Sequence, residues 1–427
     1  MTPETLPRPG PESTAGAAAP HATAPRYLAV QLGARRRYAV PAALAREGML
    51  ETLYTDACGN LGLGRLAACL PKALRGAALE SLASRQIPAE LLDKTVSFAW
   101  REMRGAALGS LTRDRDRRGR LRDAAAHGAG PAMIRRGVGR ATHVYSMLGQ
   151  VITFVEYARS RGLTVVSDFF IMPSGQAITI REARDYPMLA EPPPPDLAEA
   201  RMGYVQRVAD ATDYAICPSE RVADDLSETL GFPREKSFVV PFGVPESALA
   251  IENEPEPGRV LFAGTADVRK GIHYLAQAAN VMKIAPSPLA FRVAGNVTER
   301  VRAYCHEIAP QMRFLGRLPY SAMLEEFRRA DLFVLPTLCE GSAGAVYEAL
   351  GAGLPVVTTA AAGSIVRDEF EGRIVPERDP HALAEAIAEI AADRDLRTRL
   401  ASNAKNRARE FSWNRYAEHL ASVLRGL

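Results

Sequence analysis

Residues 331–359 read DLFVLPTLCEGSAGAVYEALGAGLPVVTT, and this stretch decides the fold. Its segment 332–336 is short and strongly apolar, which is typical of a buried parallel strand. Residues 337–343 interrupt the pattern with a cysteine, an acid, glycine and serine, as a functional loop does. A helix with small residues is predicted over 345–351, and a second apolar strand over 354–358. The loop of this strand–loop–helix–strand unit lies at the carboxyl end of a strand, where open α/β sheets bind ligands.

Two carboxylates flank this loop and helix. Glu340 lies in the loop and Glu348 inside the helix, with seven residues between them. Each has an ordinary explanation, since Glu340 could cap the helix N-terminus and Glu348 could lie on a solvated face. Glu348, however, has Val346, Ala349 and Leu350 as neighbours, and an acid in such surroundings is costly without a partner. The hydroxyl pair of a sugar or ribose is a suitable partner, because a carboxylate accepts two hydroxyl hydrogen bonds at once.

These residues resemble the signature of a known family. Glu340 and Glu348, with the intervening GSAGAVY and the trailing EALGAGLPVV, resemble the E-x7-E motif of GT-B glycosyltransferases, specifically the large family 4 of retaining enzymes. The resemblance covers about residues 26–427 and implies an α/β fold of the GT-B type, with two doubly wound Rossmann-like domains that face a cleft. It is specific over residues 214–244, 259–280 and 312–360.

The resemblance also implies a division of the chain. Residues 26–243 would form an N-terminal acceptor domain, and residues 259–410 a C-terminal domain that binds the nucleotide-sugar donor. The polar, Pro-rich residues 244–258 are expected to link them. A C-terminal helix over 411–427 would pack back on the first domain. Residues 1–25, rich in Pro, Ala, Ser and Thr, are expected to be a disordered tail.

A glycine-rich turn in the second half supplies two cations. Residues 259–263 predict a strand, which is followed by Gly264 and Thr265 and then by Arg269 and Lys270 before a helix. Two cations beside the N–H groups of a helix start make a natural diphosphate site, although a solvated basic turn is commoner in general. The position at the carboxyl end of a strand favours the functional interpretation. The resembling family typically has an arginine where Thr265 stands, so Arg269 would supply that charge.

The resemblance implies roles for these residues in a glycosyl transfer. Arg269 and Lys270 would stabilise the departing diphosphate, and with them no divalent metal or other cofactor is expected. Glu340 would bind the transferred sugar, and Glu348 the ribose hydroxyls. The remaining donor contacts are expected from glycines and their neighbours in five loops, namely Gly33, Gly264, Thr265, Gly295, Arg317, Gly341, Ser342, Ala343 and Gly344.

The first half contributes two of the candidate site residues. Gly33 directly follows a strand predicted over 27–32, where it either lets the backbone approach a phosphate or only forms a tight turn. Many members of the resembling family carry a histidine after the strand predicted over 163–167, beside the reacting sugar. The corresponding position here is Ser167 or Asp168. Asp168 is the candidate catalytic acid of this half, and it would either orient the acceptor or cap the following loop.

Composition limits the class of protein. The 427 residues carry a net charge of +4, which does not by itself indicate binding to nucleic acid. Five scattered cysteines without a C-x-x-C pair indicate reduced thiols in a cytoplasm and no zinc site. No apolar run approaches the roughly 18 residues of a membrane span, and the N-terminus lacks the features of a signal peptide. A cytoplasmic protein is therefore expected.

Residues 101–140 hold eleven arginines against four acids. Such a run is usually a solvated face, but it also suits contact with anionic lipid headgroups or an anionic acceptor, so peripheral contact with the inner face of a membrane is a hypothesis. No aromatic residues alternate with these arginines, which disfavours nucleic acid as a partner. Asp114 and Asp116 resemble the D-x-D metal motif of another glycosyltransferase fold. No apolar strand precedes them, and we interpret the match as coincidence.

Together these features predict a glycosyltransferase that moves a sugar from a nucleotide-diphosphate sugar to a glycan, a glycolipid or a small molecule, as in polysaccharide biosynthesis. Retention of anomeric configuration is implied by the resemblance alone. One alternative is a catalytically degenerate relative that binds a sugar nucleotide or lipid without turnover, given Thr265 and the missing histidine. Another is a nucleotide-sugar-modifying dehydrogenase or epimerase, which rests on a G-x-G-x-x-A pattern at 62–67. That pattern is separated from the preceding strand, so it is disfavoured.

Overall fold

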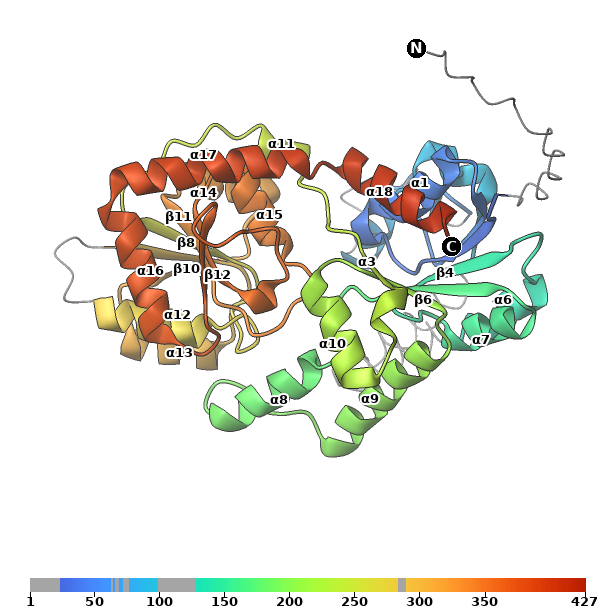
Figure 1. The fold of residues 1–427 in the computed structure, drawn as a ribbon, viewed down its shortest axis with the longest axis horizontal. Coiled ribbons are helices and arrows are strands. Elements are labelled where there is room, and N and C mark those ends of the chain that lie inside the picture. The colour runs from blue at the N-terminus through green and yellow to red at the C-terminus, as the bar shows by residue number, and fades with distance from the viewer. Residues whose placement is uncertain (1–23, 63, 66–68, 72–76, 99–127, 283–288) are drawn as a thin grey trace, which may run out of the picture.

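Two parallel β-sheets, one in each half of the chain, organise the protein (Figure 1). The computed structural model describes residues 24–62, 64–65, 69–71, 77–98, 128–282 and 289–427. The first sheet has the order β3-β2-β1-β4-β5-β6-β7 and the second β10-β9-β8-β11-β12-β13. In each sheet the chain winds outward from a central strand in one direction and then in the other, which creates a switch point beside β1 and beside β8. The predicted α/β fold of two doubly wound domains is confirmed.

The strands are short and largely buried, as expected where helices cover both faces of a parallel sheet. The first sheet contains β1 (Tyr27–Val30), β2 (Leu50–Thr55), β3 (Thr95–Ser97), β4 (His143–Met147), β5 (Thr164–Asp168), β6 (Tyr214–Cys217) and β7 (Ser237–Val239). The second contains β8 (Arg259–Ala263), β9 (Ala290–Ala294), β10 (Arg313–Gly316), β11 (Leu332–Leu335), β12 (Val356–Thr359) and β13 (Gly372–Val375).

Helices connect the strands and cover the sheets (Figure 1). The first half has α1 (Ala39–Arg46), α3 (Ala77–Ala83), α6 (Gly130–Arg136), α7 (Ile152–Ser160), α8 (Gly175–Asp185), α9 (Pro195–Asp210) and α10 (Glu220–Leu230). The second has α11 (Glu246–Leu249), α12 (Ile272–Val281), α13 (Glu299–Ile308), α14 (Tyr320–Arg329), α15 (Gly344–Gly351), α16 (Pro380–Ala392), α17 (Arg394–Glu410) and α18 (Trp413–Arg425).

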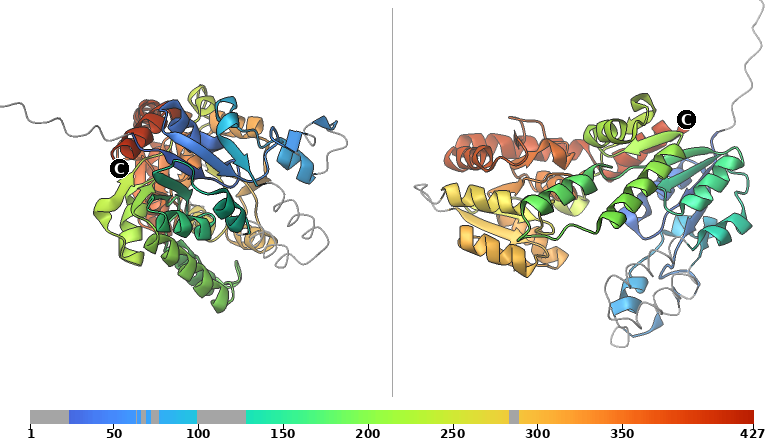
Figure 2. Two further views of the ribbon diagram at one scale, coloured as in Figure 1. Left: turned by 90° about the vertical axis from the view of Figure 1, so that its right-hand side faces the viewer. Right: turned by 90° about the horizontal axis from the view of Figure 1, so that it is seen from below.

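The chain crosses between the two domains twice along one side. The expected linker over 244–258 contains the short helix α11, which packs on α15 and α17. Lys405 of α17 holds this segment by donating to the backbone carbonyls of Leu249 and Ile251, each at 2.7 Å. The terminal helix α18 then returns to the first domain and packs on α1, where the Tyr27 hydroxyl donates to the carbonyl of Leu424 at 2.6 Å. Figure 2 shows this red helix against the blue N-terminal elements.

One local prediction is wrong. The sequence pattern predicts a continuous helix from Arg35 to Arg46, whereas the structure has a short 3-10 turn (Arg35–Tyr38) before α1. Arg36, Arg37 and Tyr38 have φ angles of 48°, 49° and 62°. Such left-handed backbone is unfavourable for residues with a side chain, so tertiary contacts must hold it. The Arg36 side chain supplies such contacts, as described below.

Several predictions fall on residues outside the described part of the chain. These are most of the expected disordered tail (1–23), residues 101–127 of the arginine-rich run together with Asp114 and Asp116, and part of the glycine pattern at 62–67. They stay predictions.

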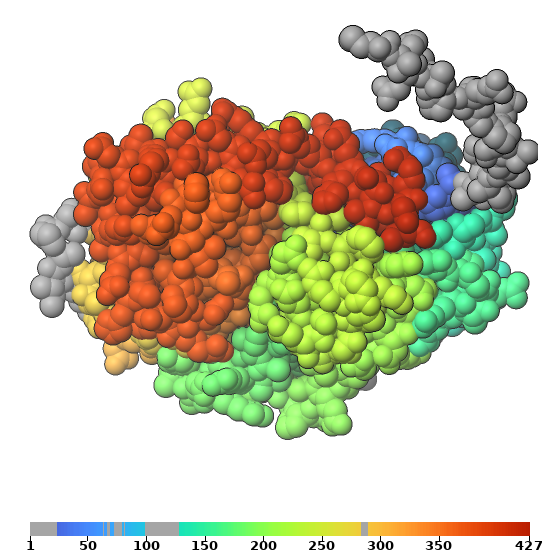
Figure 3. All heavy atoms as spheres, viewed as in Figure 1, coloured from blue at the N-terminus to red at the C-terminus, as the bar shows by residue number. Residues whose placement is uncertain are grey.

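Helix α8 belongs to the first half of the sequence but lies against the second domain. We call residues 175–191, which comprise α8 and the turn after it, the α8 arm. Leu189 of the arm is 3% exposed and is part of the second domain's hydrophobic core. In Figure 1 the helix lies beneath α12 and α13, away from the first sheet, and in Figure 3 the green arm adjoins the orange second domain. The arm therefore ties the two domains together.

A buried carboxylate anchors the arm. Glu182 is fully buried and accepts hydrogen bonds from His273 Nε2 at 2.9 Å and from the Tyr274 hydroxyl, both on α12. Arg378 Nε donates to its other oxygen at 2.9 Å. The Tyr186 ring packs on the His273 ring with 4.5 Å between centroids. Burial disfavours the charged forms of both partners. For Glu182 the hydrogen bonds from His273 and Tyr274 outweigh that effect and lower its pKa, whereas burial lowers the pKa of His273.

This cluster predicts acid sensitivity. His273 has a lowered pKa in the folded protein, so the unfolded chain takes up the proton first as the pH falls, and stability decreases below the ordinary histidine value of about 6.5. The lowered pKa of Glu182 adds a second loss below the ordinary glutamate value of about 4.3. Burial and its hydrogen bond to Glu182 raise the pKa of the neighbouring Tyr274, so this side chain stays neutral in this range.

We expect His273→Gln to reduce the loss of unfolding free energy between pH 7 and pH 5 by about 1 kcal/mol, because one proton over one pH unit is worth about 1.4 kcal/mol. The measurement is denaturant unfolding at both pH values. His381→Gln is the control, since His381 is an exposed histidine on α16. An unchanged acid loss in the His273 variant would disprove the account.

Candidate functional site

Two cations and a carboxylate meet where β8 and β11 end. Lys270 Nζ lies 2.6 Å from Glu340 Oε1, and the Arg269 guanidinium pairs with the same oxygen. Arg269 also donates to the carbonyl of Cys339 at 3.2 Å. Burial disfavours the charge on Arg269, but the carboxylates of Glu340 and Asp267 outweigh it and raise its pKa. The structure thus brings together three of the four predicted catalytic residues.

Local sequence fixes this geometry. The Asp267 carboxylate accepts a hydrogen bond from the backbone N–H of Lys270 at 2.9 Å, which closes the turn that carries both cations. Gly271 follows with a φ of 69°, and a Cβ at this position would lie 1.9 Å from the carbonyl oxygen of Pro336. Only glycine permits this approach. The turn consequently packs directly on the chain leaving β11, where Leu338 donates its N–H to the Arg269 carbonyl at 2.9 Å.

Glu348 lies on α15, the helix that follows the loop of Glu340, and its environment differs from that of Glu340. It is half-buried on α15, and its carboxylate makes no hydrogen bond or ion pair with the residues that the structure describes. Burial raises its pKa above the ordinary glutamate value. An acid that is desolvated without a partner is unfavourable in the ligand-free protein. A carboxylate with these properties is a candidate for binding a ligand.

The loop between the two glutamates contacts the first domain. A Cβ on Gly341 would lie 1.7 Å from the Phe170 carbonyl oxygen, so the two backbones touch. The Ser219 hydroxyl, which also caps α10, donates to the Gly341 carbonyl at 2.7 Å. Ser342 Oγ donates to the Tyr347 hydroxyl at 2.9 Å, and the Ala343 N–H is bonded within the second domain. This loop is therefore a fixed contact between the domains.

Gly344 differs from the rest of that loop. It is exposed at the first position of α15, and a Cβ there would meet nothing within 4 Å. The first N–H groups of a helix have no partner inside the helix and attract anions. The N-terminus of α15 thus offers N–H donors beside Glu340 on the described surface.

The other predicted donor residues lie along the ends of neighbouring strands. Gly264 and Gly295 follow β8 and β9, and a Cβ on Gly295 would lie 1.8 Å from the Gly264 carbonyl oxygen, so these loops touch. A Cβ on Gly264 would in turn lie 3.5 Å from Lys270 Cε. Thr265 and Arg317 are exposed, Arg317 directly after β10. These residues share one edge of the second sheet with Arg269 and Lys270.

The predicted residues of the first domain are already engaged. The Gly33 N–H donates to Asp56 Oδ1 at 3.0 Å, although space above the glycine is open. Asp168 is 1% exposed at the end of β5. Its carboxylate accepts two hydrogen bonds from the Arg36 guanidinium, at 2.6 and 3.0 Å, and one from the Tyr145 hydroxyl at 2.6 Å. Among the described residues, Asp168 thus pairs with Arg36 and Tyr145 rather than with the cations of the second domain.

Sequence reasoning missed the residues that complete this network. Arg36 also donates to the Tyr416 hydroxyl of α18 at 3.0 Å and lies over the Phe242 ring, 4.2 Å from its centroid. Burial raises the pKa of Tyr416 to about 12. Arg35, the preceding residue, lies over the Phe170 ring at 4.5 Å. The signal for these arginines in the sequence was only the run Arg35–Arg37, which does not reveal partners more than a hundred residues away.

None of the described helices has the length and hydrophobicity that a membrane span requires. Within the described ranges, no three His, Cys, Asp or Glu side chains are grouped so that they could hold a metal ion.

Comparison with known proteins places these features in a family context. Residues 247–407 match the family model described as Glycosyl transferases group 1. A protein from Xylanimonas cellulosilytica named D-inositol 3-phosphate glycosyltransferase is 27% identical over 244 residues, which are 51% of this chain and 58% of that protein. The chain thus matches little more than half the length of this curated relative.

Solved structures match over nearly the whole chain. Sucrose-phosphate synthase from Thermosynechococcus elongatus has a TM-score of 0.65 at 17% identity and covers 94% of this chain and 98% of its own. HepE from Anabaena, solved in complex with UDP and glucose, has a TM-score of 0.57 at 15% identity over 94% and 100%. At these identities the likeness establishes the fold, and the GT-B architecture is confirmed.

Proposed function

We propose that the protein is a retaining glycosyltransferase of family 4 that takes its sugar from a nucleotide-diphosphate donor. The match of residues 247–407 to Glycosyl transferases group 1 supports this proposal, as do relatives named as glycosyltransferases. A solved structure with UDP and glucose on a similar fold supports a nucleotide sugar as donor. The observation that carries the proposal is the meeting of Arg269, Lys270 and Glu340 beside the N-terminus of α15.

Charge explains how this cluster would act. In the ligand-free protein Glu340 is the counter-ion of both cations. A diphosphate brings more negative charge and replaces Glu340 as their partner, which frees this carboxylate to accept hydrogen bonds from sugar hydroxyls. Because Arg269 and Lys270 already supply two positive charges, the proposal requires no divalent metal. Glu348 accepts the two ribose hydroxyls and so gains the partner that it lacks.

The reaction then balances as follows. A hydroxyl oxygen of the acceptor forms a bond to the anomeric carbon of the sugar, and the bond from that carbon to the β-phosphate oxygen breaks. The diphosphate leaves with the electron pair, and the acceptor's proton passes to the departing phosphate or to water. Negative charge grows on the diphosphate in the transition state, where fixed cations and helix N–H groups lower the barrier. Retention requires the new bond to form on the face that the diphosphate leaves.

Glu348→Gln should have opposite effects on stability and binding. Loss of the charged carboxylate that accepts the ribose hydrogen bonds should weaken binding of the nucleoside diphosphate by about 10- to 100-fold, since hydrogen bonds to charged groups are worth about 1.5–3 kcal/mol. The ligand-free protein should gain about 0.5–1 kcal/mol of unfolding free energy, because a desolvated charge without a partner is removed. Calorimetric titration and denaturant unfolding measure the two effects. Glu385→Gln, at an exposed position of α16, is the control and should change neither.

The test of the proposed function is donor consumption. The protein is incubated with UDP-, GDP-, ADP- and TDP-sugars in the presence of a metal chelator, and release of nucleoside diphosphate is measured with a coupled assay. We expect one nucleotide class to be consumed, faster when a suitable acceptor is present. If nucleotides bind but none is consumed with any acceptor, the protein is a binding relative without turnover. Consumption that stops on chelation would refute metal independence.

A further inference from the structure

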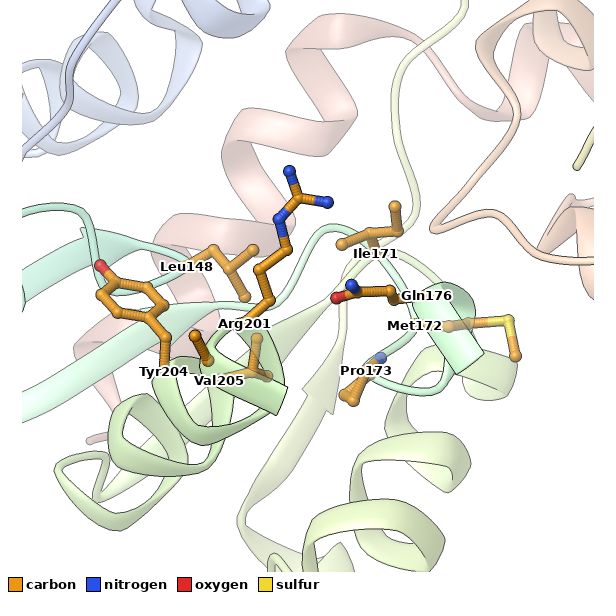
Figure 4. A pocket seen from close by; sticks show the side chains of 9 residues that line it. Leu148, Ile171, Met172, Pro173, Gln176, Arg201, Tyr204 and Val205 are labelled. Atoms are coloured by element: carbon orange, nitrogen blue, oxygen red, sulfur yellow. The ribbon is translucent and has the colours of Figure 1, made fainter. Parts of the chain in front are cut away.

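A cavity of about 430 Å³ lies in the first domain between α8 and α9 (Figure 4). Its volume falls within the range of about 300–1,000 Å³ that is usual for small-molecule sites. It lies beyond the ends of β4 and β5, where open α/β sheets bind ligands. The residues that line it are Leu148, Ile171, Met172, Pro173, Gln176, Ala200, Arg201, Tyr204 and Val205. None of them belongs to the predicted site.

The cavity adjoins the loop that carries Glu340. Ile171 lines the cavity, and its N–H nitrogen would lie 3.0 Å from a Cβ on Gly341. Gly175, at the start of the α8 arm, lies against Cys339, whose thiol donates to the Gly175 carbonyl at 3.4 Å. The segment 170–175 thus lies next to both the cavity and the loop that carries Glu340, so the cavity and the proposed donor site are neighbours.

The wall of the cavity is held in place before any ligand binds. The Asp225 carboxylate on α10 accepts hydrogen bonds from both the N–H and the hydroxyl of Ser174. On the opposite side, the Tyr204 hydroxyl donates to the Gly149 carbonyl at 2.6 Å. Such fixed walls reduce the ordering cost of binding.

Two polar groups at the cavity have no partner in the part of the chain that the structure describes. Within that part, the Gln176 side-chain nitrogen is buried and makes no hydrogen bond. Arg201 is exposed on α9, and its guanidinium makes no ion pair or hydrogen bond with the described residues. Figure 4 shows Gln176, Arg201, Leu148 and Ile171 around the same space. Both free groups are hydrogen-bond donors, and one is charged, so the matching ligand group is an anion.

The remaining walls are apolar. Leu148, Ile171, Pro173 and Val205 offer hydrocarbon surface, and burying it against a similar surface is favourable. The ligand therefore combines an apolar portion with an anionic group that can accept hydrogen bonds from Gln176 and Arg201. Inorganic phosphate would leave the walls uncovered, and a neutral alcohol would leave both donors unpaired.

We propose that this cavity is the acceptor subsite and takes an amphipathic phosphate ester, whose apolar portion lies against these walls and whose phosphate contacts Arg201 and Gln176. The assignment as an acceptor rests on the proposed function. A hydroxyl of this molecule attacks the anomeric carbon, with the bond changes given above. A soluble metabolite and the headgroup of a lipid both present this chemistry.

Binding is tested on the full chain by titration calorimetry with hexyl phosphate, which stands in for the ester. We expect one site, with hexanol and inorganic phosphate at least tenfold weaker. Arg201→Gln and Gln176→Leu should each weaken the binding of hexyl phosphate by about tenfold or more, because each removes a hydrogen bond to a charged group. Gln176→Leu should not destabilise the ligand-free protein, because it removes an unpaired buried donor.

Two control variants exclude other binding sites. Arg184→Gln removes an exposed arginine of α8 outside the cavity and should leave the affinity unchanged. Lys270→Ala should also leave it unchanged, which shows that hexyl phosphate does not bind at the diphosphate site. Equal binding in the wild type and in Arg201→Gln, or no binding in the wild type, would overturn the proposal.

Two further measurements distinguish a soluble ester from a lipid headgroup, and the cavity proposal from the proposed function. Sedimentation with phosphatidate-containing vesicles, lost in Arg201→Gln, would identify a lipid headgroup, whereas hexyl phosphate binding without sedimentation would identify a soluble ester. Nucleoside diphosphate binding is measured on the same preparation. If the nucleotide binds and hexyl phosphate does not, the cavity proposal alone fails. If hexyl phosphate binds and no nucleotide does, the ligand site stands and its assignment as an acceptor subsite fails with the proposed function.

Discussion

Lys270→Ala should lower the rate of sugar transfer by about 100- to 1,000-fold, the usual effect of removing one group that stabilises a developing anion. Lys270 is largely buried, with 12% of its side chain exposed, and its ammonium lies 2.6 Å from Glu340. In the reaction it would contact the departing diphosphate, whose charge grows in the transition state. The loss should therefore fall mainly on kcat.

The fold should survive this change. Arg269 still pairs with Glu340 in the variant, so that carboxylate keeps one counter-ion. Initial rates of nucleoside diphosphate release, measured for the wild type and the variant with the same sugar nucleotide, test the prediction. Lys236→Ala removes an exposed lysine of the first domain and is the matched control. A Lys270 variant with the wild-type rate would remove this residue from the mechanism.

Asp168→Asn should lower the free energy of unfolding by about 3 kcal/mol, because it leaves the Arg36 guanidinium largely buried without its counter-ion. Removal of one partner of a buried pair typically costs about 3–5 kcal/mol, and asparagine retains part of the hydrogen bonding. The network also joins β5 to the left-handed turn at Arg36 and to Tyr416 of α18. Its loss should loosen the return of the terminal helix to the first domain.

A double-mutant cycle separates structure from catalysis. Arg36→Met combined with Asp168→Leu should be less destabilising than the sum of the single changes, since no charge is left without a partner. Denaturant unfolding gives the stabilities, and transfer rates are measured below the unfolding transition. If Asp168→Asn keeps full stability but loses transfer, Asp168 is the acceptor-orienting acid and its structural role here is refuted.

The sequence predicted the second domain better than the first, for a physical reason. In the stretch 331–359 the local signals all predict the same strand–loop–helix unit. They are an apolar strand, a loop of small residues and a helix with one acid among apolar neighbours. Contacts of Arg269, Lys270 and Glu340 depend on loops at the ends of adjacent strands, and parallel topology alone brings those together. The geometry of this cluster thus followed from the order of the strands.

The first domain depends on contacts that no local pattern reveals. Asp168 and Arg36 form a hydrogen bond although 132 positions separate them in the sequence. The turn that carries Arg36 has left-handed residues where a helix is expected. Similarly, α8 carries an ordinary amphipathic pattern, yet its Glu182 is buried against α12 of the other domain. The cavity between α8 and α9 depends on the α8 arm being held against the second domain. Its lining residues could therefore not be predicted from the sequence.

The central claim, a nucleotide-diphosphate site on the second domain, is tested most directly by thermal unfolding with a panel of nucleoside diphosphates and without metal. A ligand that binds only the folded state raises its stability by about 2.7 kcal/mol at 100 times the dissociation constant. We predict that one nucleoside diphosphate raises the melting temperature of the wild type by several degrees and that Lys270→Ala and Glu348→Gln reduce or abolish this shift. A wild type whose melting temperature is unchanged by every member of the panel would contradict the account.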